Sequence, residues 1–107
     1  MNKEIWTIWP DIRLLNELGQ NTLKEQLGIV FTEAGPNYLR AAMPVDRRTV
    51  QYLGMLHGGA SVALAETVAS TAANLVINPE THYALGLEIN ANHIRSLREG
   101  TVYAHAE

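Results

Sequence analysis

One carboxylate in the middle of the sequence has almost entirely apolar neighbours. Glu66 is the only ionisable residue between His57 and Glu80, and valine, leucine and alanine predominate around it. Removing a lone carboxylate from water costs several kcal/mol unless the group is paired or its pKa rises. Glu66 is therefore a candidate for acid–base or nucleophilic chemistry. A half-exposed helix that points Glu66 into solvent would account for the same pattern.

A pair of glycines precedes Glu66, at the point where we expect a loop to become a helix. The start of a helix offers free N–H groups and the positive end of the helix dipole. In His57-Gly58-Gly59, the glycines leave those N–H groups open to an acyl oxygen. A thioester carbonyl bound there would be polarised, and the oxyanion formed by attack on it would be stabilised. A tight turn that requires small residues, with His57 as a buried and hydrogen-bonded histidine, would also explain the motif.

The spacing of these residues constrains how they could act together. Gln51 lies six positions before His57 and could donate a side-chain N–H to the same oxygen or position a water, although a loop glutamine is more often simply solvated. Glu66 follows Gly58 by eight positions, which is about 12 Å along one helix. The carboxylate therefore cannot reach an acyl carbon held at the start of its own helix. A two-fold dimer with antiparallel helices would bring each Glu66 to the partner's Gly58, so we expect at least a dimer with shared sites.

The helix that would carry both groups is predicted from Gly58 to Ile77. Its alanines favour helix, and Asn78-Pro79 ends it. Small residues dominate this stretch and would let a neighbouring backbone approach closely. We therefore expect a central, enclosed helix, with Gly59 and Ser70 on the face of Glu66 and Asn74 at the edge of that face.

Shorter elements are expected on both sides of this helix. Asp11 can cap a first short helix that ends at Gly19, and Thr22 with Glu25 has the spacing of a capping box for a second one. Strands are predicted at residues 29–34, 38–43, 83–94 and 101–106. The first two would form one antiparallel hairpin. The last two would form another, joined by the turn Arg98-Glu99-Gly100. Residues 83–94 alternate between apolar and polar side chains as a half-buried strand does. This order indicates an α+β class, with an antiparallel sheet on a central helix.

The composition narrows the possible functions. The chain has 107 residues, of which 47% are hydrophobic and 18% charged, so we expect one globular domain over residues 1–107. A net charge of −3 gives no general attraction for nucleic acid. The absence of cysteine excludes disulfides, thiolate nucleophiles and cysteine-type zinc sites, and fits a cytoplasmic location. We expect no membrane span, because the longest weakly polar stretch contains Glu66 and Asn74.

The combined motifs resemble those of a known family. They are Met43-Pro44-Val45-Asp46, Arg48-Thr49, Gln51, Leu56-His57-Gly58-Gly59-Ala60-Ser61, Leu64-Ala65-Glu66 and Gly86-Leu87-Glu88-Ile89-Asn90-Ala91-Asn92-His93. Over roughly residues 11–106, the sequence resembles the hotdog-fold thioesterases of the phenylacetate/4-hydroxybenzoyl-CoA type. The nearest likeness is to the branch that acts on 1,4-dihydroxy-2-naphthoyl-CoA in menaquinone synthesis. The resemblance implies a long central helix wrapped by an antiparallel sheet and hydrolysis of an aromatic or medium acyl-CoA. It also implies a homodimer or homotetramer that needs no metal and no cofactor, since CoA is part of the substrate.

The same resemblance implies a role for each site residue. Glu66 would be the nucleophile or the general base, and these two roles stay open. Gly58 would donate the N–H to the oxyanion, Gln51 and His57 would orient the thioester and water, and Ser70 would lie beside the carboxylate. The pantetheine arm and the nucleotide of CoA would be bound by His93, Arg95 and Ser96.

The family's sheet continues beyond the residue that corresponds to Glu107, so we expect that C-terminal strands are missing and that the sheet has an open edge. Two other functions remain open. The protein could bind an acyl-CoA or an acyl carrier without turnover, or it could be a hotdog dehydratase in which His57 and Glu66 act as a pair.

Overall fold

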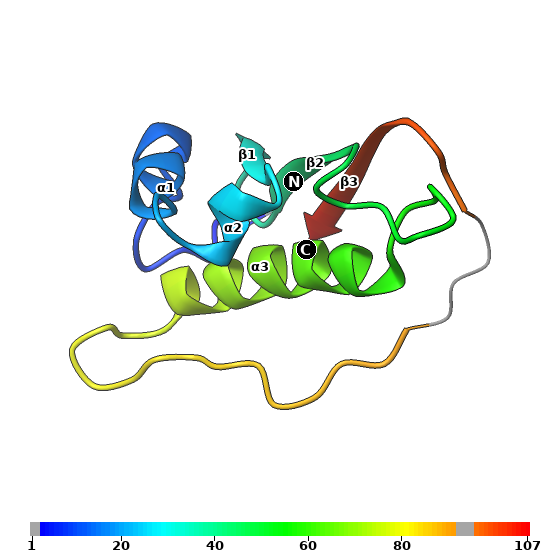
Figure 1. Ribbon diagram of the computed structural model, residues 1–107. Helices are drawn as coiled ribbons and strands as arrows, with labels where there is room; N and C mark the ends of the chain where they lie inside the picture. Colours follow the sequence, from blue (N-terminus) through cyan, green and yellow to red (C-terminus); the bar gives the residue numbers. More distant parts are fainter. Residues whose placement is uncertain (1–2, 92–95) are drawn as a thin grey trace.

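The computed structural model describes residues 3–91 and 96–107. The elements follow the chain as α1 (Ile12–Leu18), α2 (Leu23–Gln26), β1 (Val30–Ala34), β2 (Leu39–Val45), α3 (Gly58–Val76) and β3 (Gly100–Ala106). Figure 1 shows α3 lying across one face of the sheet, with α1 and α2 beside one end of that sheet. The expected α+β class, with a long helix against an antiparallel sheet, is confirmed.

The three strands form one antiparallel sheet in the order β1-β2-β3. β1 and β2 form the expected hairpin, with Ala34 opposite Leu39, and a bulge follows Phe31. The buried core joins this sheet to α3. It consists of Ile29, Phe31, Leu39, Ala41, Met43, Ala60, Leu64 and Val68.

The long helix α3 is buried on one side only. Ala60, Leu64 and Val68 are buried at spacings of four residues, which places them in one stripe against the sheet. The opposite side of α3 includes Ala65 and Ala69, and both are exposed in this chain. The expectation of an enclosed helix is therefore met on one face of α3 and not on the other. Among the helices of the described residues, none combines the length and the apolar character that crossing a membrane requires.

The two short helices differ in how they begin. α1 starts as predicted, because the Asp11 carboxylate accepts a hydrogen bond from the Leu14 N–H. The capping box predicted for α2 is wrong in detail. Thr22 stands at the N-cap position but its side chain caps no helix N–H, and the Glu25 carboxylate accepts from the N–H of Asn21 instead of that of Thr22.

The largest correction concerns the strand predicted at residues 83–94. Residues 83–91 form no strand, and residues 92–94 lie outside the described part of the chain. The segment runs as extended chain along α3, on the side away from the sheet (Figure 1). A strand is stable only when a neighbour pairs with its backbone. Within the described ranges, this segment is held by Asn74, whose side-chain amide bonds both the N–H and the C=O of Ala84.

The predicted second hairpin is also wrong, because β3 pairs with β2. The register runs from Leu39 opposite Ala106 to Val45 opposite Gly100. The strand predicted at residues 101–106 is confirmed as β3. The local sequence does not identify its partner, since the pattern of side chains along a strand fixes which face is buried and not which strand lies next to it.

Candidate active site

The start of α3 is shaped by His57. This residue is the N-cap, and its ring Nδ1 accepts a hydrogen bond of 2.8 Å from the N–H of Gly59. Because Nδ1 accepts, the neutral ring carries its proton on Nε2. The Gly59 N–H is thus occupied within the chain. Among the described residues, no group accepts from the N–H of Gly58, which makes this amide the one available to a ligand.

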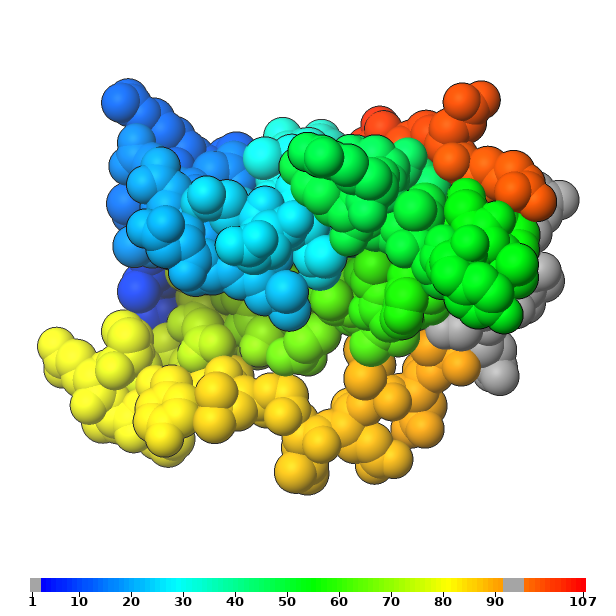
Figure 2. Space-filling view, viewed as in Figure 1, coloured from blue at the N-terminus to red at the C-terminus, as the bar shows by residue number. Residues whose placement is uncertain are grey.

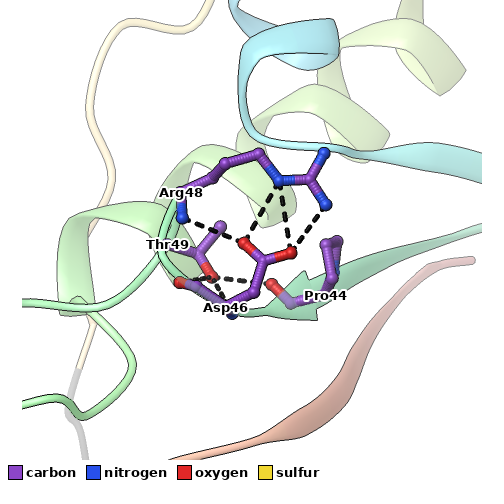
Figure 3. A network of polar contacts seen from close by, with 4 residues as sticks. All are labelled: Pro44, Asp46, Arg48 and Thr49. Atoms are coloured by element: carbon purple, nitrogen blue, oxygen red, sulfur yellow. Dashed lines mark hydrogen bonds and ion pairs between the residues drawn. The ribbon is translucent and has the colours of Figure 1, made fainter.

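The loop that delivers His57 to this position is fixed by a buried threonine. Thr49 is 1% exposed, and its hydroxyl donates to the Pro44 carbonyl and accepts from the N–H of Asp46 (Figure 3). Its own carbonyl accepts from the His57 N–H at 2.8 Å. Arg48 closes the same turn through its hydrogen bonds to Asp46, which lower the pKa of that carboxyl to about 2. The turn therefore connects the end of β2 directly to the start of α3.

Replacing Thr49 with valine is expected to destabilise the fold by about 1–3 kcal/mol, because the part-buried N–H of Asp46 loses its partner. Urea unfolding measures the change. Thr32→Val serves as the matched control, since Thr32 lies exposed on β1 and its replacement is expected to change the free energy of unfolding by about 0.5 kcal/mol or less. Equal losses in the two variants would contradict the role given to Thr49.

Gln51 lies at the start of a tight turn just before His57. Its backbone bonds Met55 and Gly54, and its side-chain oxygen accepts from the N–H of Leu53. The side-chain oxygen is thus occupied, and the NH₂ group has no partner among the described residues. Gln51 is half-buried. Its side-chain NH₂ group therefore remains able to donate to an acyl oxygen or to position a water.

Glu66 lies on α3 and lines a cavity of about 350 Å³. The far wall of this cavity is the extended segment that follows α3, and Figure 2 shows openings between that segment and the body of the molecule. Gly86 of the segment lies against the carboxylate so closely that a Cβ there would be 2.5 Å from Oε1 of Glu66. Glu66 is half-buried and, within the described ranges, its carboxylate has no hydrogen-bond or ion-pair partner. The contact with Gly86 was not predicted, although a glycine within an alternating apolar segment is a signal of close approach.

The other candidate residues are distributed around α3. Ser70 lines a separate cavity with residues of α1, so this chain alone does not bring it into the cavity of Glu66. Ser96 is exposed and precedes Leu97, whose carbonyl accepts from the N–H of Leu56 in the loop before α3. His93 and Arg95 lie outside the described residues. Within residues 3–91 and 96–107, no group of three or more His, Asp or Glu side chains could hold a metal ion.

These features can be compared with known proteins. Residues 53–107 match the family described as the thioesterase superfamily. The 1,4-dihydroxy-2-naphthoyl-CoA hydrolase of Escherichia coli is 48% identical over 98 residues, which are 92% of this chain and 71% of that protein. The crystal structure of a Pseudomonas aeruginosa thioesterase matches with a TM-score of 0.93 and 45% identity, covering 95% of this chain and 73% of that chain.

A thioesterase of Staphylococcus aureus matches with a TM-score of 0.73 and 37% identity, covering 78% of this chain and 69% of that chain. Its solved structures include one with a glutamine and one with a glutamate replaced by alanine. This chain spans 65% of the length of a Vibrio cholerae relative that is 52% identical to it. The sequence matches, the long helix on its antiparallel sheet and the fit to solved thioesterases agree, so this chain belongs to the thioesterase superfamily and has the hotdog fold of thioester hydrolases.

Proposed function

We propose that the protein hydrolyses an aromatic or medium acyl-CoA to the free acid and CoA. The Gly58 N–H would hold the thioester carbonyl oxygen, and Glu66 would attack the acyl carbon or activate the water that does. Gln51 and the Nε2–H of His57 are the further donors near the helix start. The name of the Escherichia coli relative makes 1,4-dihydroxy-2-naphthoyl-CoA the first substrate to consider.

The observation that carries this proposal is that one of the two glycine N–H groups at the helix start is hydrogen-bonded within the chain and the other is not. His57 occupies the N–H of Gly59, and the N–H of Gly58 stays available at the positive end of a helix of 19 residues. A single directed amide at that position can stabilise a developing oxyanion.

Catalysis by both groups requires a second copy of the chain. α3 is one continuous helix, so Glu66 stands about 12 Å along it from Gly58. The exposed face of α3 carries Ala65 and Ala69, which are small enough for another helix to approach closely. A two-fold dimer that joins these faces in antiparallel fashion would place each Glu66 near the partner's Gly58.

The Staphylococcus aureus structures support the choice of Gln51 and Glu66. In that protein, the replaced glutamine and the replaced glutamate are 15 positions apart. Gln51 and Glu66 are also 15 positions apart in this chain. The spacing supports the view that the glutamine of the loop and the carboxylate of α3 belong to one site.

The proposal predicts that the purified protein releases free thiol from benzoyl-CoA, because benzoyl is a compact aromatic acyl group. The release is followed with a thiol reagent, and benzoic acid is quantified in the same samples. A protein that is stabilised against heat by benzoyl-CoA yet releases no thiol from it, or from 1,4-dihydroxy-2-naphthoyl-CoA, would be a binding module and not a hydrolase.

A further inference from the structure

The start of α3 is flanked by two cavities. The first is the cavity of about 350 Å³ that contains Glu66. The second has a volume of about 300 Å³ and lies between α3, α2 and the loop that precedes α3. Gly59 and Ala63 line both cavities, so an acyl group held at the helix start could enter either of them.

The two cavities differ in the charged side chains that a bound acyl group would cover. Two carboxylates, those of Glu66 and Glu88, line the first cavity. The Glu88 carboxylate accepts one hydrogen bond from the Asn90 side chain at 3.2 Å, whereas that of Glu66 has no partner among the described residues. Covering these carboxylates with an apolar group is costly, because they lose their hydration without gaining a new partner. The second cavity has one charged side chain, Arg48, and its guanidinium is already paired with Asp46 at 2.7 Å.

We propose that the second cavity is the acyl pocket and that α2 sets the size of the acyl group. This inference rests on the proposed hydrolysis. A thioester oxygen at the Gly58 N–H would direct its acyl group between α2 and α3, away from the two carboxylates. The wall on the α2 side is built by Leu23 and Leu27, and the remaining apolar surface comes from Val50, Ala60 and Ala63.

The volume of this pocket indicates the class of substrate. Ligand pockets usually measure about 300–1,000 Å³, so a pocket of about 300 Å³ lies at the lower limit. It suits a compact, flat acyl group such as an aromatic ring better than a long alkyl chain. Leu27 is partly buried against the core, whereas Leu23 is 64% exposed. Leu23 can therefore be changed in size without disturbing the core.

The test compares the kcat/KM of thiol release for 1-naphthoyl-CoA with that for benzoyl-CoA. Leu23→Ala widens the pocket and is expected to raise this ratio about 10-fold, while Leu23→Phe narrows it and is expected to lower the ratio by a similar factor. Leu18 provides the matched control, since it is 68% exposed and lines a different cavity at the other end of α3. Leu18→Ala and Leu18→Phe are expected to change the ratio less than about twofold.

Two results would overturn the assignment of this pocket. One is an active protein whose ratio is the same in wild type and in both Leu23 variants. The other is a ratio that responds to Leu18 as strongly as to Leu23. A wild type that releases no thiol would refute the proposed hydrolysis instead. The pocket assignment is then tested by the ratio of the Kd values for 1-naphthoyl-CoA and benzoyl-CoA, measured by calorimetry in the wild type and in the same Leu23 and Leu18 variants.

Discussion

Replacing Glu66 with glutamine is expected to slow the release of thiol from benzoyl-CoA by about 10²–10⁴-fold. Glutamine has nearly the same size as glutamate, so it fills the same space beside Gly86. It lacks the negative charge and the basicity that attack on the acyl carbon, or activation of water, requires. No described residue forms an ion pair with Glu66, so the substitution leaves no buried partner charge unpaired.

The control for this variant is Glu88→Gln. Glu88 lines the same cavity from its opposite wall, so its replacement changes the local charge equally without touching α3. We expect the rate of Glu88→Gln to stay within about threefold of the wild type, since a screened carboxylate contributes little at a distance. Equal rates for wild type and Glu66→Gln would remove Glu66 from the mechanism. Solvent-oxygen labelling in a single turnover then separates attack by Glu66 itself from activation of water.

The features that the sequence predicted well are local along the chain. The cap at Asp11, the hairpin between β1 and β2 and the span of α3 each depend on residues within a few positions of one another. The same holds for the relation between Gly58 and Glu66, because a helix converts their separation in sequence directly into a distance. These predictions therefore needed no knowledge of the tertiary structure.

The features that the sequence predicted poorly depend on distant partners. Residues 83–91 have the alternating pattern of a strand, yet Leu85 is 77% exposed and Leu87 is 100% exposed. The pattern shows that one face of this segment has to be covered, but it carries no information about which backbone pairs with it. For the same reason, the pairing of β3 with β2 could not be read from residues 101–106 alone.

The candidate site shows the same division between local and distant information. His57, Gly58 and Glu66 could be selected from their residue types and spacing. The use of the Gly59 N–H by His57, and the wall that Leu23 adds from α2, depend on side-chain orientation and on packing between elements. Thr49 gave no signal beyond its place in the motif, although it is the most buried polar residue of the described chain.

Replacing Gly58 with proline is expected to lower kcat about 10²–10³-fold while leaving the fold intact. Proline has no N–H, so the variant lacks the amide that the oxyanion would use. Gly58 is the first residue of α3, a position where proline is well tolerated in helices. His57 already has φ of −69° and ψ of 126°, an extended conformation of the kind that a residue before proline prefers. Gly58→Ala retains the N–H and is the control, and circular dichroism checks the helix content of both variants.

Combining the two inactive variants tests whether each site is shared between two copies. In a dimer with one Glu66→Gln chain and one Gly58→Pro chain, one site has both native groups and the other has neither. Refolding the variants together from an equal mixture makes about half of the dimers mixed, so about a quarter of the wild-type activity is expected to return. Activity that stays at the level of the separate variants would refute a site shared between two copies. It would also refute the joint action of Gly58 and Glu66, because these residues of one copy stand about 12 Å apart along α3.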